Sequence, residues 1–154
     1  MLIVTWAVLL VLAGFALRGQ RWAYAAFIAT GLTSFAARTG FRLQPQPCEL
    51  VVGLQWVLVS FTNYWHIVIF TMFFILSHAQ VRARGVQGFL WAAAATLLMG
   101  AVLEIAQALT GSGHCRLRDL IPDAVGAVLG MCLVLLWQRV TAQITATSPT
   151  PRVP

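Results

Sequence analysis

The stretch FLWAAAATLLMGAVLEIAQALT, residues 89–110, decides the fold class. A helix that crosses the hydrocarbon core of a bilayer needs about 20 predominantly apolar residues, and this stretch supplies them. Its only charged residue is Glu104. The sequence therefore predicts a membrane-spanning helix here, with one acidic side chain that an apolar environment makes energetically costly.

The composition of the whole chain favours the same class. The 154 residues are 60% hydrophobic and 9% charged, whereas soluble domains are about 25% charged. The ten basic residues are all arginines, and they fall between apolar runs instead of forming one basic patch. This distribution is typical of contact with lipid headgroups and disfavours nucleic-acid binding. We expect membrane lipids as partners and no nucleic acid.

The apolar runs predict an all-α fold, a polytopic transmembrane helical bundle of about five spanning helices. Runs somewhat shorter than 20 residues are included because flanking Arg and Trp side chains reach to the interface. One further apolar segment, residues 51–61, is too short to cross alone, and we interpret it as an interfacial or re-entrant helix. The predicted spans are residues 2–17, 22–37, 64–80, 89–110 and 124–137.

Four parts follow from these runs. Residues 1–38 form an N-terminal transmembrane hairpin, because only a few residues separate the first two runs. Residues 39–61 hold a loop with two prolines, which exclude a regular helix, and then the interfacial segment. Residues 62–139 form a three-helix core. Residues 140–154 are small, polar and Pro-rich, and we expect a flexible tail.

The arginines divide unevenly between the two faces of this topology. By the positive-inside rule, the N-terminus lies outside and the C-terminus in the cytoplasm. We therefore expect a multi-pass protein of the bacterial inner membrane. One face carries Arg18, Arg21, Arg82, Arg84, Arg139 and Arg152, and the other carries Arg38, Arg42, Arg116 and Arg118.

The cysteines show no metal-site pattern, and a disulfide is an open alternative, since two loop cysteines need not lie close together. On the outer side of a bacterial inner membrane, Cys48 and Cys115 would meet oxidising conditions and could form a disulfide. The three cysteines show no CxxC motif and no Cys/His spacing suited to zinc. We predict no metal site and no cofactor from these patterns.

Alternating helix direction brings five polar residues of the core to one membrane face, whichever face that is. They lie at the start of the third span, at the end of the fourth and at the start of the fifth. Residues three apart on a helix share a face, so Glu104 and Gln107 point the same way. The five residues are His66, Glu104, Gln107, Asp119 and Asp123.

Glu104 needs a partner, since an ionised carboxylate in the apolar region costs roughly 2.5 to 3.5 kcal/mol at a helix centre. The candidates at its level are Arg116, Arg118 and His66, and a proton shared with Asp123 is a further alternative. The group either binds a headgroup or transfers a proton, or it is a polar network that only fixes helix packing. Arg118 would pair with a carboxylate or a substrate phosphate.

Gly126 and Gly130 form a small-xxx-small pair, which lets a neighbouring helix approach the backbone closely. Pro122 suits the first turn of the fifth span, where a missing N–H costs nothing, and Asp119 could cap that helix. We therefore predict helix packing at the two glycines.

These motifs together resemble the VanZ-like family of small membrane proteins. The similar segments are His66 with Phe70, Glu104-Ile-Ala-Gln107, and Asp119-Leu-Ile-Pro-Asp123-Ala-Val-Gly126-Ala-Val-Leu-Gly130. The chain departs from the family pattern at four positions. Thr62 and Asn63 stand where the family has Asp and Lys, Gly113 stands near its loop Arg, and Asp123 stands where Asn is common.

The resemblance implies a cell-envelope protein, related to a family associated with glycopeptide antibiotic resistance, and makes residues 62–139 a VanZ-like core. It supplies no reaction. We expect a polar pocket at the outer membrane face that binds a lipid or cell-envelope amphiphile. The alternative is a non-catalytic accessory subunit packed against a larger respiratory or photosynthetic membrane complex. A membrane hydrolase or transferase would need a nucleophile that the sequence does not offer.

Overall fold

The structure is a computed structural model that describes residues 2–36, 43–50, 53–111 and 115–147. These residues fold almost entirely into helices, and they hold no strand, only a bridge between Glu49 and Arg116. The all-α prediction is confirmed. The helices are α1 Leu2–Leu17, α2 Arg21–Ala36, α3 Leu54–Ser60, α4 Tyr64–Gln80, α5 Val86–Thr110, the short 3-10 helix η1 Leu117–Asp119, and α6 Leu120–Thr147.

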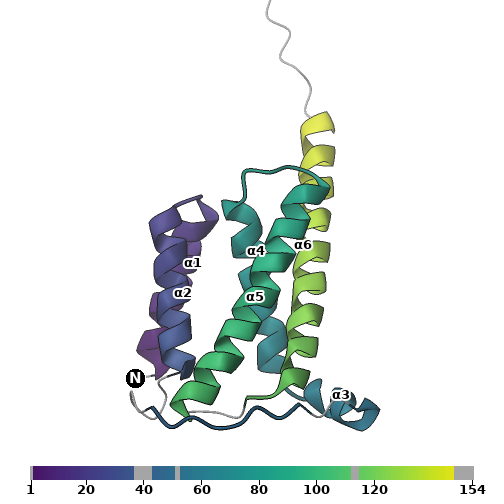
Figure 1. Cartoon of the computed structure of the whole chain (residues 1–154). Coiled ribbons are helices and arrows are strands. Elements are labelled where there is room, and N and C mark those ends of the chain that lie inside the picture. The colour runs from purple at the N-terminus through teal and green to yellow at the C-terminus, as the bar shows by residue number, and fades with distance from the viewer. Residues whose placement is uncertain (1, 37–42, 51–52, 112–114, 148–154) are drawn as a thin grey trace, which may run out of the picture.

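Five of the helices run side by side in alternating directions, while α3 lies across one end of the bundle (Figure 1). We call this end the site end; α4 begins there, α5 ends there and α6 begins there. The opposite end holds the α1–α2 turn and the α4–α5 connection. The turn between α1 and α2 is tight because Gly19 adopts a positive φ of 80°, which favours glycine.

Helix length corrects the predicted number of spans. Within the described residues, two helical segments are long and apolar enough to cross a membrane, and they are Val86–Thr110 and Leu117–Ala146. At about 1.5 Å per residue, the 25 residues of α5 extend roughly 37 Å, but the 16 residues of α1 extend only about 24 Å. The prediction of about five spanning helices is therefore wrong by this measure, although all five helices form.

Several predicted boundaries change as well, since the span predicted at 89–110 begins at Val86 and the span predicted at 124–137 begins at Leu120. The apolar segment 51–61 contains α3, which is short and lies at the bundle end (Figure 1). The tail predicted from residue 140 is wrong as far as Thr147, because α6 continues to that residue. The hydroxyl of Thr141 donates to the carbonyl of Trp137 at 2.9 Å, so a polar side chain of this stretch finds its hydrogen-bond partner within the helix. Residues 148–154 lie outside the described residues.

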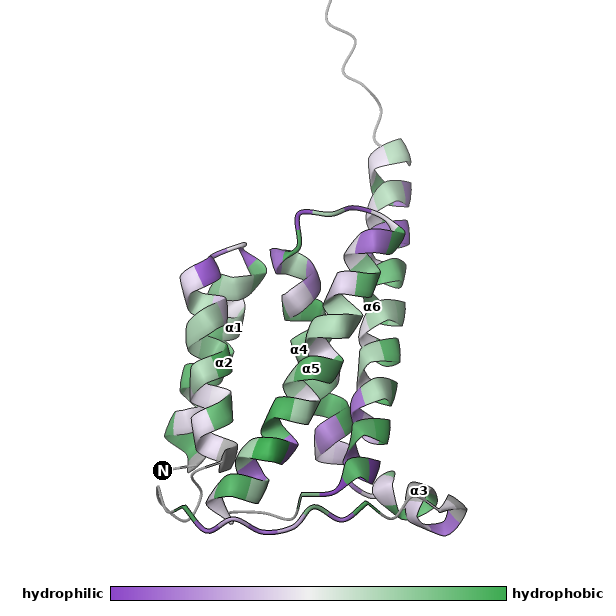
Figure 2. Ribbon diagram, in the orientation of Figure 1, coloured by the Kyte–Doolittle hydropathy of each residue, from purple (hydrophilic) through white to green (hydrophobic). Residues whose placement is uncertain are grey.

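Hydrophobic residues predominate along the helices, and most of the strongly hydrophilic residues lie near the two ends of the bundle (Figure 2). In the most apolar stretch of α5, and likewise of α6, only 28% of the residues are buried within the chain. A core helix of a soluble domain would bury most of such a stretch, so these apolar sides are left to face an apolar surrounding or a partner.

The hairpin of α1 and α2 is fastened to α4 by polar as well as apolar contacts. Phe73 and Leu76 of α4 are buried against the hairpin. The Tyr24 hydroxyl lies 2.8 Å from the Ser77 hydroxyl, and the Gln80 amide nitrogen donates to the carbonyl of Ala16 at 2.6 Å. These bonds hold the opposite end of the bundle together.

The two glycines of α6 lie directly against α4. A Cβ added to Gly126 would come within 2.7 Å of the Ile67 carbonyl oxygen, and one on Gly130 within 2.9 Å of the Thr71 carbonyl oxygen. No side chain fits between these backbones. The close approach brings the start of α6 against the start of α4, where the polar residues lie.

Candidate functional site

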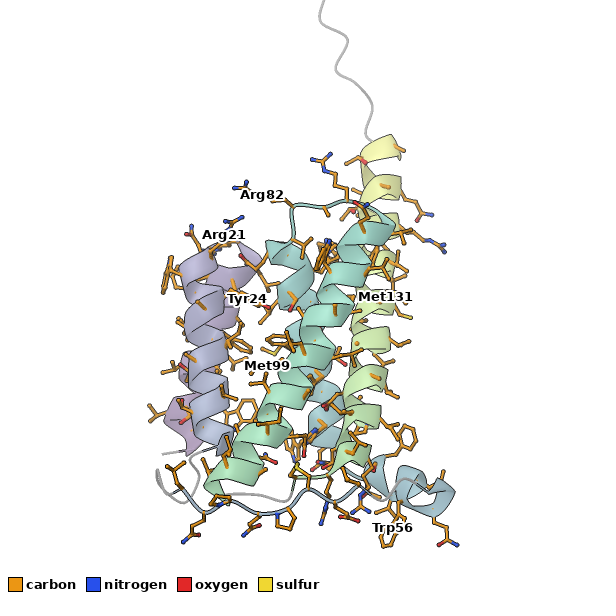
Figure 3. The ribbon with its side chains drawn as sticks, in the orientation of Figure 1. Arg21, Tyr24, Trp56, Arg82, Met99 and Met131 are labelled. Carbon is orange, nitrogen blue, oxygen red and sulfur yellow. A yellow bond between two sulfur atoms is a disulfide. The ribbon has the colours of Figure 1, made fainter. Side chains whose placement is uncertain are left out.

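All four acidic residues of the chain lie at the site end, and the rest of the bundle has none. The arginines described at the opposite end have no carboxylate there to pair with; Arg21 and Arg82 are labelled among them in Figure 3. They are Arg18, Arg21, Arg82, Arg84 and Arg139, while Arg38, Arg42 and Arg152 lie outside the described residues. The charge of the molecule is thus separated along the bundle axis.

His66 and Asp123 form the deepest polar contact of the site. The His66 Nδ1 lies 2.8 Å from Asp123 Oδ1, and Asp123 is 0% exposed. An ionised carboxylate only accepts, so the Nδ1–H donates and the ring lone pair lies on Nε2. The imidazole stacks on Phe70, with ring centroids 5.9 Å apart. The ring is therefore held in one orientation by an acid on one side and an aromatic face on another.

The second oxygen of Asp123 faces the backbone of α5. It has no hydrogen-bond partner within the described residues, and an added Cβ at Gly100 would collide with it. Glycine at position 100 is what makes room for this carboxylate between α5 and α6.

Glu104 lies near the end of α5 and is 5% exposed. Its Oε2 accepts a hydrogen bond from the backbone N–H of Arg116 at 2.6 Å, while its Oε1 is buried and has no hydrogen-bond partner among the described residues. The partners predicted for Glu104 from the sequence were all side chains, whereas the partner observed is a backbone amide. No periodicity argument predicts such a bond, because the loop conformation sets it.

The structure gathers three possible metal donors from three elements. One ligand atom each from His66 of α4, Glu104 of α5 and Asp119 of η1 lie within 4.8 Å of one another. The sequence predicted that these residues share a level, but it predicted no metal site, because local Cys and His spacing cannot reveal donors that come from separate elements.

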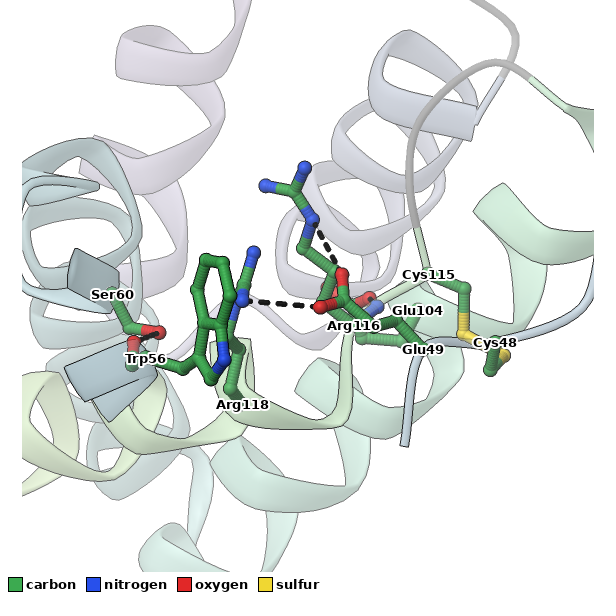
Figure 4. A network of polar contacts seen from close by, with 8 residues as sticks. All are labelled: Cys48, Glu49, Trp56, Ser60, Glu104, Cys115, Arg116 and Arg118. Carbon is green, nitrogen blue, oxygen red and sulfur yellow. Dashed lines mark hydrogen bonds and ion pairs between the residues drawn. A yellow bond between two sulfur atoms is a disulfide. The ribbon is translucent and has the colours of Figure 1, made fainter. Parts of the chain in front are cut away.

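Arg118 pairs with an acid that sequence reasoning missed (Figure 4). Its Nη1 donates to Glu49 Oε1 at 3.2 Å, and the Nε of Arg116 lies 3.4 Å from Glu49 Oε2. The Arg118 guanidinium also lies over the Trp56 ring, 4.7 Å from its centroid, which is a cation–π contact. The signal available in the sequence was that Glu49 is the single acid in a loop beside Cys48.

Residues 43–50 form a strap across the site end. The N–H of Gln46 donates to the carbonyl of Ala108 at 2.8 Å, so the strap satisfies a carbonyl that the end of α5 leaves without a helical partner. Further along, the Glu49 N–H donates to the Cys115 carbonyl at 2.9 Å, and a disulfide joins Cys48 to Cys115. The disulfide considered from the sequence is present.

The remaining predicted residues lie close by. Gln107 lies one turn beyond Glu104, is partly buried, and its carbonyl accepts the N–H of Gly111 at 2.9 Å. Asp119 is 7% exposed and directly precedes α6, and Pro122 lies in the first turn of that helix, as predicted. Gly113, near which the family pattern has an Arg, lies outside the described residues.

An apolar cavity of about 50 Å³ adjoins this group, between the α1–α2 hairpin and helices α4 and α5. One of its lining residues touches the polar site, since Phe70 stacks on His66, and another, Leu103, is the sequence neighbour of Glu104. Gly31 of α2 also lines it, and an added Cβ there would meet nothing within 4 Å. The site therefore joins a polar group to a small apolar space.

Comparison of the chain with protein-family models, with curated proteins and with solved structures finds no match.

Proposed function

We propose that the chain is a multi-pass protein of the bacterial inner membrane, with a VanZ-like core whose polar site binds a lipid or cell-envelope amphiphile. The observation that carries this proposal is the junction of the half-buried His66 and the buried Glu104 with an apolar cavity lined by Phe70 and Leu103. An amphiphile has the same division, a polar head joined to an apolar chain.

The chemistry of the polar group favours one kind of head. Both described arginines of the site end are paired with Glu49, so the group formed by Glu104, Asp119 and Asp123 offers mainly acceptor oxygens. Acceptors bind a hydroxyl, an ammonium group or a cation. The cavity beside them has an apolar lining and room for only a few water-sized groups, which suits a short section of an acyl chain.

The charge distribution supports an orientation with the N-terminus outside. The described arginines without a carboxylate partner gather at the end where α1 turns into α2, and arginines are retained on the cytoplasmic side. The site end would then face the oxidising side of the membrane, which agrees with the disulfide between Cys48 and Cys115. The short helices α1, α2 and α4 would pack beside α5 and α6 within the bilayer.

A non-catalytic accessory subunit of a larger membrane complex, respiratory or photosynthetic, is the second candidate. The observation that favours it is the number of contacts that fix packing at the site end, among them the bond of Glu104 to the Arg116 amide. In this case the polar group would hold the loops in place, and the exposed apolar sides would meet other subunits instead of lipid.

Binding of phosphatidylethanolamine to the detergent-solubilised protein, followed by native mass spectrometry, tests the proposal. Gly31→Leu fills the cavity, and we expect it to weaken lipid binding about tenfold, equivalent to about 1.4 kcal/mol. Gly14→Leu is the matched control, because Gly14 also lies in a helix with open space around it but does not line the cavity. Glu104→Gln, which keeps the shape of the side chain, should weaken binding as well.

Unchanged lipid binding by folded Gly31→Leu and Glu104→Gln proteins would refute the binding pocket. The accessory-subunit hypothesis would then remain. Purification in mild detergent separates the two candidates further, since a lone monomer argues against a subunit of a larger complex.

A further inference from the structure

The polar group at the site end gathers three buried acids, and within the described residues the only side chain that pairs with any of them is His66, which bonds to Asp123. Glu104, Asp119 and Asp123 are 5%, 7% and 0% exposed. Among the described residues, no arginine side chain forms an ion pair with any of the three, because the site-end arginines pair with Glu49. Buried carboxylates are normally paired with a cation or coordinate a metal, since removing an unpaired charge from water is very costly.

The donor atoms of this group converge. The ligand atoms of His66, Glu104 and Asp119 lie within 4.8 Å of one another. Glu104 adds an independent indication, because its Oε1 is buried and accepts no hydrogen bond from the described residues. Within the part of the chain that the structure describes, this buried oxygen therefore has no cationic partner.

The environment of His66 is the one that metal-bound histidines have. Such a histidine donates its second ring N–H to a carboxylate or a carbonyl, and this bond fixes the ring and makes the other nitrogen a better ligand. Here the Nδ1 bonds to Asp123 Oδ1 at 2.8 Å, and Phe70 supports one face of the ring. With Nδ1 bonded to the carboxylate, Nε2 would be the coordinating atom.

We propose that His66, Glu104 and Asp119 bind a divalent transition-metal cation of the Mn²⁺ to Zn²⁺ series, with Asp123 orienting the histidine. One imidazole and two carboxylates form a mixed donor set that suits these ions better than Mg²⁺ or Ca²⁺, which prefer oxygen donors alone. At bond lengths of 2.0 to 2.2 Å, tetrahedral donor atoms lie roughly 3.3 to 3.6 Å apart, so the three donors close by about an ångström on binding.

Three protein donors leave a coordination position open. In zinc sites this position is taken by water or by a substrate. The metal site shares the site end with the proposed amphiphile site but does not depend on lipid binding, so each can be refuted without the other.

The test uses the full-length protein in detergent, stripped with a chelator and carrying no histidine tag. Zn²⁺ binding is measured by elemental analysis after dialysis, and Mn²⁺ binding by loss of the free-ion signal in electron paramagnetic resonance. We expect one bound ion per chain. His66→Gln and Glu104→Gln should each lower the affinity by more than about tenfold.

Two matched substitutions serve as controls. His78→Gln changes the other described histidine of α4, which stacks on Phe89 away from the site, and Glu49→Gln removes a site-end carboxylate outside the donor group. Both should bind the metal like the wild type. Affinity that is unchanged in Glu104→Gln, or lost equally in His78→Gln, overturns the proposal.

A measurement on the wild type covers the case in which the site variants fail to fold. A ligand that binds only the folded state raises the unfolding temperature, so Zn²⁺ or Mn²⁺ should stabilise the stripped protein where Mg²⁺ does not. A stripped wild-type protein that takes up neither ion and gains no stability from them also overturns the proposal.

Discussion

At the scale of single residues, the site depends on one carboxylate that fits between two helices. Asp123 bonds to His66 through one oxygen and directs the other at the backbone of Gly100. A side chain at position 100 and the carboxylate cannot occupy the same space. Gly100 is thus as necessary to the histidine orientation as Asp123 itself.

Gly100→Ala should displace the Asp123 carboxylate and break its bond to His66. We expect a loss of about 1 to 3 kcal/mol in the free energy of unfolding, the usual cost of leaving a buried polar group unsatisfied. Gly14→Ala is the control, since its Cβ would meet nothing within 4 Å and alanine favours helix over glycine. Thermal unfolding in detergent measures both, and equal stability of the two variants would contradict this account.

The sequence predicted which polar residues share a level but not how they pair. His66, Glu104 and Asp123 were placed together by counting helix directions, which needs only the order of the apolar runs. Pairing depends on loop backbone and side-chain torsions. The sequence therefore did not predict the bond from the Arg116 amide to Glu104. It also did not predict the pairing of Arg118 with Glu49, which lies in a loop without periodicity.

At the scale of elements, helices α4 and α6 form the closest contact of the bundle. The Ile67 and Thr71 carbonyl oxygens lie where a side chain on Gly126 or Gly130 would have to be. These are backbone atoms, which cannot rotate away as a flexible side chain does. The contact fixes the distance between the helices that carry His66 and Asp123.

Gly126→Ala should force α4 and α6 apart and cost about 1 to 3 kcal/mol, as other overpacked interiors do. The wider spacing should also weaken whatever the site binds, because the donors on the two helices move together with their backbones. Stability is compared with that of Gly14→Ala by the same unfolding measurement. A Gly126→Ala protein as stable as this control would show that the contact is looser than described.

Helix existence followed from apolar runs, whereas helix ends did not. The five runs all became helices, and Pro122 lies in a first turn as its missing N–H suggests. The continuation of α6 to Thr147 was hidden, because threonines that bond to carbonyls one turn back make a polar stretch helical. Apolar composition alone predicts too many spanning helices, because α1, α2 and α4 are apolar but only 16, 16 and 17 residues long.

At the scale of the whole molecule, the two ends of the bundle have different chemistry. One end carries arginines that have no described carboxylate partner, and the other carries all the acids, the strap and the disulfide. The strap of residues 43–50 closes over the end of α5 and brings Glu49 to its arginines. Loss of the disulfide would free the strap that covers the site.

Thiol counting tests the disulfide directly. The unfolded protein should react with one maleimide per chain before reduction, at Cys132, and with three after reduction. In Cys132→Ser the counts should fall to none and two. Mass spectrometry measures the additions, and three reactive thiols in the unreduced wild type would contradict the structure. Reduction should also lower stability by about 2 to 4 kcal/mol.

The disulfide also imposes an order on biosynthesis. Its cysteines are 67 positions apart in the sequence, and a ribosome adding about 5 to 20 residues per second needs roughly 3 to 13 s to make that interval. Throughout this time Cys48 is a free thiol, while α3, α4 and α5 are still being made. The disulfide that fixes the strap can form only after α5 and Cys115 have been made, so the site end cannot be covered in its final form before this stage of synthesis.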